Sequence, residues 1–166
     1  MRVDNEIRYP ASPDEVAAML ADEAFQERKL VATHAVSHEI EITGDASGAF
    51  TVTTRRTLPT DDVPDVARRF VGPTIDVRQV EAWEAPDADG ARTGTVEVQI
   101  AGAPVRLSGT LSLVPDGEGT VEVMTGELKA SVPLVGGRLE QAAQPAFLAA
   151  IRKEQEVGTA WLAGER

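Results

Sequence analysis

The order of two periodic patterns limits the fold of this chain more than any other feature. About seven segments alternate between apolar and polar residues, with only short helical stretches between them. One long helical pattern then closes the chain, and no strand pattern follows it. Strands that alternate in this way bury one face, and that face needs another element to cover it. The sequence therefore predicts an α+β fold in which the last helix covers a curved sheet and encloses a space.

Composition limits the class of function. The chain has 166 residues, and we expect one domain, residues 1–166, that buries roughly two-thirds of its unfolded surface. A net charge of -11 disfavours binding to nucleic acid or docking on anionic membranes. The absence of cysteine excludes disulfides and thiolate chemistry. The polar start and the lack of a bilayer-spanning apolar run predict a cytoplasmic protein without stable membrane insertion.

Seven antiparallel strands and a few helices are expected. The strand patterns cover residues 2–9, 34–43, 49–58, 74–85, 92–100, 105–114 and 120–132. Turns rich in Gly and Asp between the later strands favour consecutive hairpins. Two short helices should follow the first strand, one opened by a capping box of Ser12 and Glu15 and one over residues 23–30. Residues 59–70 should form a loop with about two helical turns, and a single helix kinked at Pro145 should begin near Arg138.

Three segments carry a resemblance to a known family. They are residues 11–16 (Ala-Ser-Pro-Asp-Glu-Val), 55–59 (Arg-Arg-Thr-Leu-Pro) and 132–140 (Val-Pro-Leu-Val-Gly-Gly-Arg-Leu-Glu). Together with the order of elements, they resemble the START-like, or polyketide cyclase-like (SRPBCC), superfamily, and within it the actinobacterial domain of unknown function DUF2505. The resemblance covers essentially the whole chain. It implies a helix-grip fold with a cavity between the sheet and the last helix, in a superfamily that binds lipids, sterols, polyketides or hormones. It implies no catalytic residue.

Polar residues on otherwise apolar stripes are the candidates for a binding site, because an inward charge needs a partner. Arg56 shares a strand face with Phe50, and Glu154 lies seven residues after Phe147 on the closing helix. We expect Arg56 to pair with Glu81 or Glu154 across the enclosed space. The expected wall residues are Arg56, Gln79, Glu81, Trp83, Phe147, Ile151, Glu154 and Trp161. Alternatively, the polar members pair only with one another or lie at a sheet edge, and the apolar members are ordinary core.

Neither a metal nor a cofactor is expected. His34 and His38 are the only histidines, and a spacing of four on a strand separates them by about 13 Å. That distance prevents the pair from chelating one ion. No serine lies in a Gly-x-Ser-x-Gly motif, and no catalytic residue is assigned.

The leading hypothesis is a non-enzymatic binding protein for a small hydrophobic or amphipathic molecule, such as a lipid-like or polyketide-like metabolite. One alternative is a cyclase or hydrolase that uses a cavity carboxylate, such as Glu81 or Glu154, as an acid/base, which requires an unpaired carboxylate beside the cavity. The other is a structural module whose cavity is filled by its own side chains.

Overall fold

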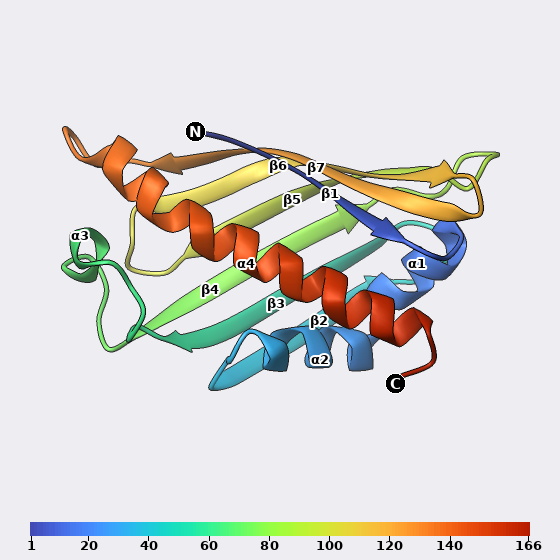
Figure 1. Ribbon diagram of the computed structural model, residues 1–166, viewed down its shortest axis with the longest axis horizontal. Helices are drawn as coiled ribbons and strands as arrows, with labels where there is room; N and C mark the ends of the chain where they lie inside the picture. Colours follow the sequence, from blue (N-terminus) through green and yellow to red (C-terminus); the bar gives the residue numbers. More distant parts are fainter.

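The computed structural model describes all 166 residues, which fold around one antiparallel sheet of seven strands (Figure 1). The strands are β1 (Arg2–Tyr9), β2 (Ser37–Gly44), β3 (Phe50–Pro59), β4 (Thr74–Trp83), β5 (Arg92–Ile100), β6 (Val105–Asp116) and β7 (Gly119–Ala130). Strands β2 to β7 pair in chain order, and β1 pairs with β7, so that β1 and β2 form the two borders of the sheet. The expected curved antiparallel sheet is confirmed.

Four helices accompany the sheet: α1 (Pro13–Leu20), α2 (Glu23–Ala32), α3 (Asp65–Arg68) and α4 (Gly136–Leu162). Figure 1 shows α4 running diagonally across one face of the sheet, with α1 and α2 near its C-terminal end and α3 at the opposite end. This is the predicted helix-grip arrangement. None of the four helices combines the length and the apolarity needed to cross a bilayer.

Local chemistry accounts for the helix starts. Ser12 accepts a hydrogen bond from the Glu15 amide at 3.3 Å, and the Glu15 carboxylate accepts one from the Ser12 amide at 2.9 Å. This reciprocal capping box begins α1 as expected. Asp22 caps α2 in a similar way through the amides of Ala24 and Phe25. Helix α4 continues through Pro145 as one element of 27 residues, which confirms a single helix rather than two.

Two expectations about local structure are wrong. Strand β2 begins at Ser37 rather than His34, because α2 continues to Ala32 and His34 then takes a left-handed conformation with φ of 62°. A left-handed residue just after a helix ends it, so His34 belongs to the turn and not to the strand face. The second correction concerns residues 59–70, which contain the single helical turn α3 instead of two turns.

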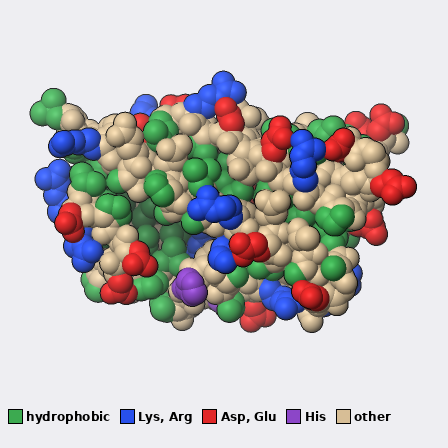
Figure 2. All heavy atoms as spheres, viewed as in Figure 1, with side chains coloured by type: hydrophobic (Ala, Val, Ile, Leu, Met, Phe, Trp, Pro, Cys, Tyr) green, Lys and Arg blue, Asp and Glu red, His purple; other side chains and the backbone are tan.

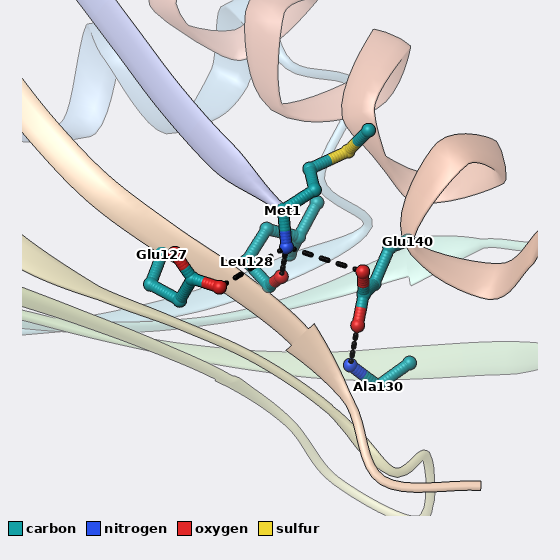
Figure 3. A network of polar contacts seen from close by, with 5 residues as sticks. All are labelled: Met1, Glu127, Leu128, Ala130 and Glu140. Atoms are coloured by element: carbon teal, nitrogen blue, oxygen red, sulfur yellow. Dashed lines mark hydrogen bonds and ion pairs between the residues drawn. The ribbon is translucent and has the colours of Figure 1, made fainter. Parts of the chain in front are cut away.

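A polar network holds the start of α4 against the sheet (Figure 3). The amino group of Met1 donates to Glu140 Oε2 at 3.1 Å and to Glu127 Oε1 at 3.3 Å. The other oxygen of Glu140 accepts a hydrogen bond from the Ala130 amide at 3.0 Å. Glu140 therefore ties the first turns of α4 to the end of β7 and to the N-terminus.

The packed core includes large aromatic contacts. The rings of Phe50 and Trp83 stack with centroids 6.4 Å apart, and Phe25 meets Trp161 edge-on at 5.8 Å. These residues and the neighbouring apolar side chains of α1 are buried. The remaining inward-facing side chains of the sheet lie under α4, where the packing leaves space.

Candidate functional site

Two spaces lie between α4 and the sheet. The first, here called the polar cavity, has a volume of about 70 Å³ and includes charged or amide side chains among its lining residues. The second, here called the apolar pocket, has a volume of about 230 Å³, and 14 of its 18 lining residues are hydrophobic. Phe147 lines both spaces and therefore stands between them. The polar cavity is lined by Asn5, Ile7, Lys29, Thr33, Arg56, Gln79, Glu81, Val96, Val98, Leu107, Leu111, Glu122, Met124, Phe147, Ala150, Ile151 and Glu154.

The apolar pocket lies near α3, beneath the first half of α4. Its walls come from the loop around α3, from the ends of β3, β4 and β6, and from α4. Representative members are Leu58, Phe70, Ile75, Leu139 and Ala143. Figure 2 shows hydrophobic side chains lining a hollow on this face of the molecule, in the left half of the view. The pocket offers mainly apolar surface, and Asp62 is the one charged residue in its lining.

Lys29 is the centre of a buried ion cluster in the polar cavity. Its amino group lies 3.3 Å from Glu154 Oε2 and 3.7 Å from Glu81 Oε1. Gln79 donates a hydrogen bond to the same Glu81 oxygen at 2.6 Å. Burial would lower the pKa of Lys29, but the attraction of Glu154 and Glu81 outweighs it and raises that pKa. Lys29 is therefore a permanent cation that links α2 to β4 and α4.

Glu122 of β7 is the third carboxyl group of the cavity, and it forms no ion pair. Its side chain is only 6% exposed. Burial, together with the nearby charges of Glu154 and Glu81, raises the pKa of Glu122 well above its ordinary value. Burial also raises the pKa of Glu154, an effect that Lys29 opposes. The surroundings therefore favour the neutral form of Glu122.

Several buried polar atoms of the cavity have no hydrogen-bond partner in the protein. They include Glu81 Oε2, Glu122 Oε2, Glu154 Oε1 and Arg56 Nε. Arg56 is half-buried between β2 and β4, and burial lowers its pKa against the opposing effect of Glu154 and Glu81. Unpartnered polar groups of this kind are uncommon in protein interiors, and a bound water, an ion or a functional role can account for them.

The predicted pairing of Arg56 with Glu81 or Glu154 is wrong, because Lys29 makes both ion pairs. Arg56 is close enough to both carboxylates to be influenced by them, yet it is in ion-pair contact with neither. Lys29 reaches the cluster from α2, which packs beside α4 and projects the lysine towards it. Lys29 therefore partly neutralises Glu81 and Glu154 in the absence of a ligand.

Six of the eight residues expected in the wall line the polar cavity: Arg56, Gln79, Glu81, Phe147, Ile151 and Glu154. The other two, Trp83 and Trp161, line neither space. Trp83 is buried against Phe50, and Trp161 against Phe25. Large flat side chains at these positions complete the core at the ends of the sheet face and do not reach the cavity.

Sequence reasoning missed Lys29 and Glu122. A signal for each was present. Lys29 lies four residues after the buried Phe25, which places both side chains on one face of α2. Glu122 alternates with Thr120 and Met124 on β7, and so faces inward with them.

The histidines do not form a metal site. His34 lies in the turn after α2, while Nε2 of His38 in β2 is 3.8 Å from Glu27 Oε1. No group of three or more His, Asp or Glu side chains is arranged to hold a metal ion.

The enzyme alternative requires an unpaired carboxylate beside the cavity, and Glu81 and Glu154 are the candidates that the sequence offers for it. Both are in ion-pair contact with Lys29. Neither is therefore the free acid/base that this hypothesis needs. The filled-cavity alternative meets the opposite difficulty, since packing leaves both the polar cavity and the apolar pocket open.

Comparison with solved structures gives the fold. The protein TTHA0849 of Thermus thermophilus is 20% identical with a TM-score of 0.62, and the match covers all of both chains. A STAR-related lipid transfer protein of Xanthomonas axonopodis is 19% identical with a TM-score of 0.60, covering 98% of this chain and 85% of that one. At these identities the similarity shows a shared START-like helix-grip fold.

Comparison with sequences gives the family. The uncharacterized protein Rv0481c of Mycobacterium tuberculosis (strain ATCC 25618 / H37Rv) is 26% identical over 161 residues, covering 93% of this chain and 92% of the relative. The family described as "Protein of unknown function (DUF2505)" matches residues 4–162, which is nearly the whole sheet and all of α4. The chain therefore belongs to the DUF2505 family and has the START-like fold that its sequence predicts.

Proposed function

We propose that the protein binds one small amphipathic molecule, lipid-like or polyketide-like, in the space between the sheet and α4. The apolar part of the ligand would occupy the apolar pocket, and its polar end would face the polar cavity. The observation that carries this proposal is the position of Phe147, which separates a hydrophobic space from one whose buried polar atoms lack partners. Apolar surface supplies affinity, while a few fixed polar groups set orientation.

The volumes limit the size of the ligand. Pockets for drug-sized molecules typically measure about 300–1,000 Å³. The apolar pocket measures about 230 Å³, so a ligand that fits without rearrangement is small. A longer molecule would have to displace Phe147 and enter both spaces. The lipid-transfer name of the Xanthomonas axonopodis structure supports an apolar ligand for this chain.

The direct test is native mass spectrometry of protein purified from its own host, followed by extraction of the bound molecule. Ala143→Phe should fill the apolar pocket and remove the bound mass, because Ala143 lines it. Ala149→Phe is the matched control, since Ala149 is exposed on the same helix and should leave binding intact. Wild-type protein that is repeatedly empty and takes up no apolar probe would contradict the proposal.

Two further expectations belong to the same proposal. Binding would be the whole function, without catalysis by Glu81 or Glu154, both of which are paired with Lys29. The protein would act in the cytoplasm on a small molecule. Its net charge of -11 disfavours nucleic acid as a partner.

A further inference from the structure

We propose that the polar cavity selects a protonated amine, so that the polar end of the ligand is an ammonium group held by Glu81, Glu122 and Glu154. This inference rests on the proposed function and narrows it to one chemical class of ligand. It depends on three buried carboxyl groups that come from three different elements and line one enclosed space.

The three glutamates come from β4, β7 and α4 and all line the polar cavity. Glu81 and Glu122 are 5% and 6% exposed, and the Glu154 side chain is 12% exposed. Each has one buried oxygen without a hydrogen-bond partner in the protein. An ammonium group carries three N–H donors and no acceptor, which matches a wall of unpartnered carboxylate oxygens. Hydrogen bonds between such charged groups are the stronger kind.

Charge balance favours a cation. Lys29 and Arg56 give the cavity wall two positive charges, and the three glutamates give it three negative charges when all are ionised. The ionised wall thus carries a net charge of -1, which one ammonium group would cancel. Buried charges are costly unless they are compensated, so without a ligand the net charge of the cavity wall requires another source of compensation.

A proton on Glu122 provides that balance in the empty protein. The titratable and charged groups near Glu122 are Tyr9 of β1, Lys29 of α2, Glu81 of β4 and Glu154 of α4, and Arg56 of β3 lines the same cavity. Burial and the charges of Glu154 and Glu81 raise the pKa of Glu122 against the opposing effect of Lys29. An ammonium group beside Glu122 would reverse this preference, and Glu122 would release its proton as the amine binds.

Arg56 would favour an anionic ligand, because its buried Nε also lacks a hydrogen-bond partner. The same cavity contains three buried acceptor oxygens without a partner, one each from Glu81, Glu122 and Glu154, but only this one donor nitrogen. An anionic ligand would add a negative charge to a wall that already has a surplus of carboxylates. Arg56 also lines an open groove with His38 and Arg78, so it is not confined to the polar cavity.

The neighbouring side chains suit the remainder of such a ligand. Ile7, Phe147 and Ile151 line the polar cavity beside the carboxyl groups, and Phe147 leads to the apolar pocket. A primary amine with a short hydrocarbon tail would place its charge among the glutamates and its tail against Phe147.

The test is isothermal titration calorimetry with n-hexylamine, n-hexanol and hexanoate, which share a tail and differ in the polar end. We expect hexylamine to bind about tenfold more tightly than hexanol at about pH 8, the size of a charge-assisted hydrogen bond. Hexylamine affinity should rise with pH by up to about tenfold per pH unit while Glu122 remains protonated, because one proton leaves. Titrations in buffers of different ionisation enthalpy should report that proton, and hexanol should release none.

Glu122→Gln should abolish the proton release and reduce the preference for amine over alcohol to about one, since it removes the titrating carboxyl. Glu118→Gln makes the same change in the exposed turn before β7 and should leave both quantities as in the wild type. Circular dichroism of both variants checks that they fold.

The outcomes separate the two proposals. Binding of hexanol or hexanoate in preference to hexylamine would overturn the amine inference and leave the proposed function standing. Tighter hexylamine binding without proton release, or with release that persists in Glu122→Gln, would also overturn it. If none of the three probes binds, and the protein from its host is empty, both proposals fail.

Discussion

At the scale of single residues, Glu122 links the stability of the protein to pH. Its pKa in the folded protein is raised above the ordinary value of 4.5 by burial and by Glu154 and Glu81. Between these two pKa values the folded protein holds a proton that the unfolded chain has lost. The stability contributed by the neutral carboxyl is therefore complete below the ordinary pKa and is lost as the pH rises towards the folded pKa.

Replacing Glu122 by glutamine should remove this loss. We expect Glu122→Gln to be more stable than the wild type by about 1–3 kcal/mol at alkaline pH, because no charge has to be buried. The difference should fade as the pH falls towards 4.5. Urea unfolding of both proteins across this range measures it. A wild type whose stability increases between mildly acidic and alkaline pH relative to the variant would contradict the prediction.

Lys29 offers a second prediction at this scale. Lys29→Met keeps an unbranched side chain, one atom shorter, but leaves Glu81 and Glu154 without their cation. Breaking a buried ion pair in this way should lower the free energy of unfolding by about 3–5 kcal/mol at neutral pH. The control is Lys153→Met, because Lys153 is exposed and pairs only with Glu156 on the surface. Equal losses in the two variants, measured by urea unfolding, would contradict this prediction, because the buried cluster would then contribute no more stability than the surface pair.

The sequence predicted some of these residues and not others, for physical reasons. Alternation along β3 and β4 places Arg56, Gln79 and Glu81 on the buried face, and the structure has them there. The identity of the ion pairs depends on where α2 packs against the sheet, which no local pattern encodes. Lys29 could therefore not be predicted as a site residue, because an isolated lysine on a short, weakly amphipathic helix is ordinarily expected to be exposed.

At the scale of elements, α4 packs closely against the end of β1 at Gly158. A Cβ atom at this position would lie 2.7 Å from Tyr9 Cε1 and 3.2 Å from Met19 Cε. Gly158 is thus the place where the helix can rest directly on the Tyr9 ring. The opposite end of α4 is held by the contacts of Glu140 with Met1 and Ala130. The helix is fixed at both ends, while its middle spans the two spaces.

Substitution at Gly158 should disturb this contact. We expect Gly158→Ala to lower the free energy of unfolding by about 1–3 kcal/mol, because the Tyr9 ring or the helix must move to admit the methyl group. Gly137→Ala is the matched control, as a Cβ there meets nothing within 4 Å. Its stability should be unchanged or slightly raised. Thermal unfolding distinguishes them, and a neutral Gly158→Ala would show that the close approach is easily relieved.

Element boundaries were predictable where turn or capping chemistry is local. Ser12 and Glu15 begin α1 as their spacing predicts, and residues 92–100 form β5 as expected. The alternation of its neighbours predicts a strand at His34, but a left-handed residue after a helix is decided by the backbone of the preceding turn. Periodicity alone does not detect such a residue.

At the scale of the whole molecule, Phe147 divides the interior into a polar and an apolar space. The sequence predicted that the last helix would cover the sheet, and this follows from the need to bury one face. The volume left under the helix depends on how every inward side chain packs, and no pattern in the sequence gives it. The division at Phe147 was therefore not predictable.

Shortening Phe147 should join the two spaces. We expect Phe147→Ala to bind longer n-alkanols than the wild type, whose apolar pocket of about 230 Å³ limits chain length. The variant should also lose about 3–5 kcal/mol of stability, as a large aromatic side chain is removed. Leu148→Ala, which changes a neighbour that lines neither space, should keep the wild-type length limit. Titration with a series of alkanols measures the limit, and an identical limit in both variants would contradict this account.

The two borders of the sheet have a consequence for behaviour at high concentration. Border strands can recruit strands of other copies and so start aggregation. Here the solvent side of β1 carries Arg2, Asp4, Glu6 and Arg8, and that of β2 carries Glu39 and Glu41. Growth of the sheet from one β2 onto another would bring like charges together, so crowded solutions of this protein should resist fibril formation.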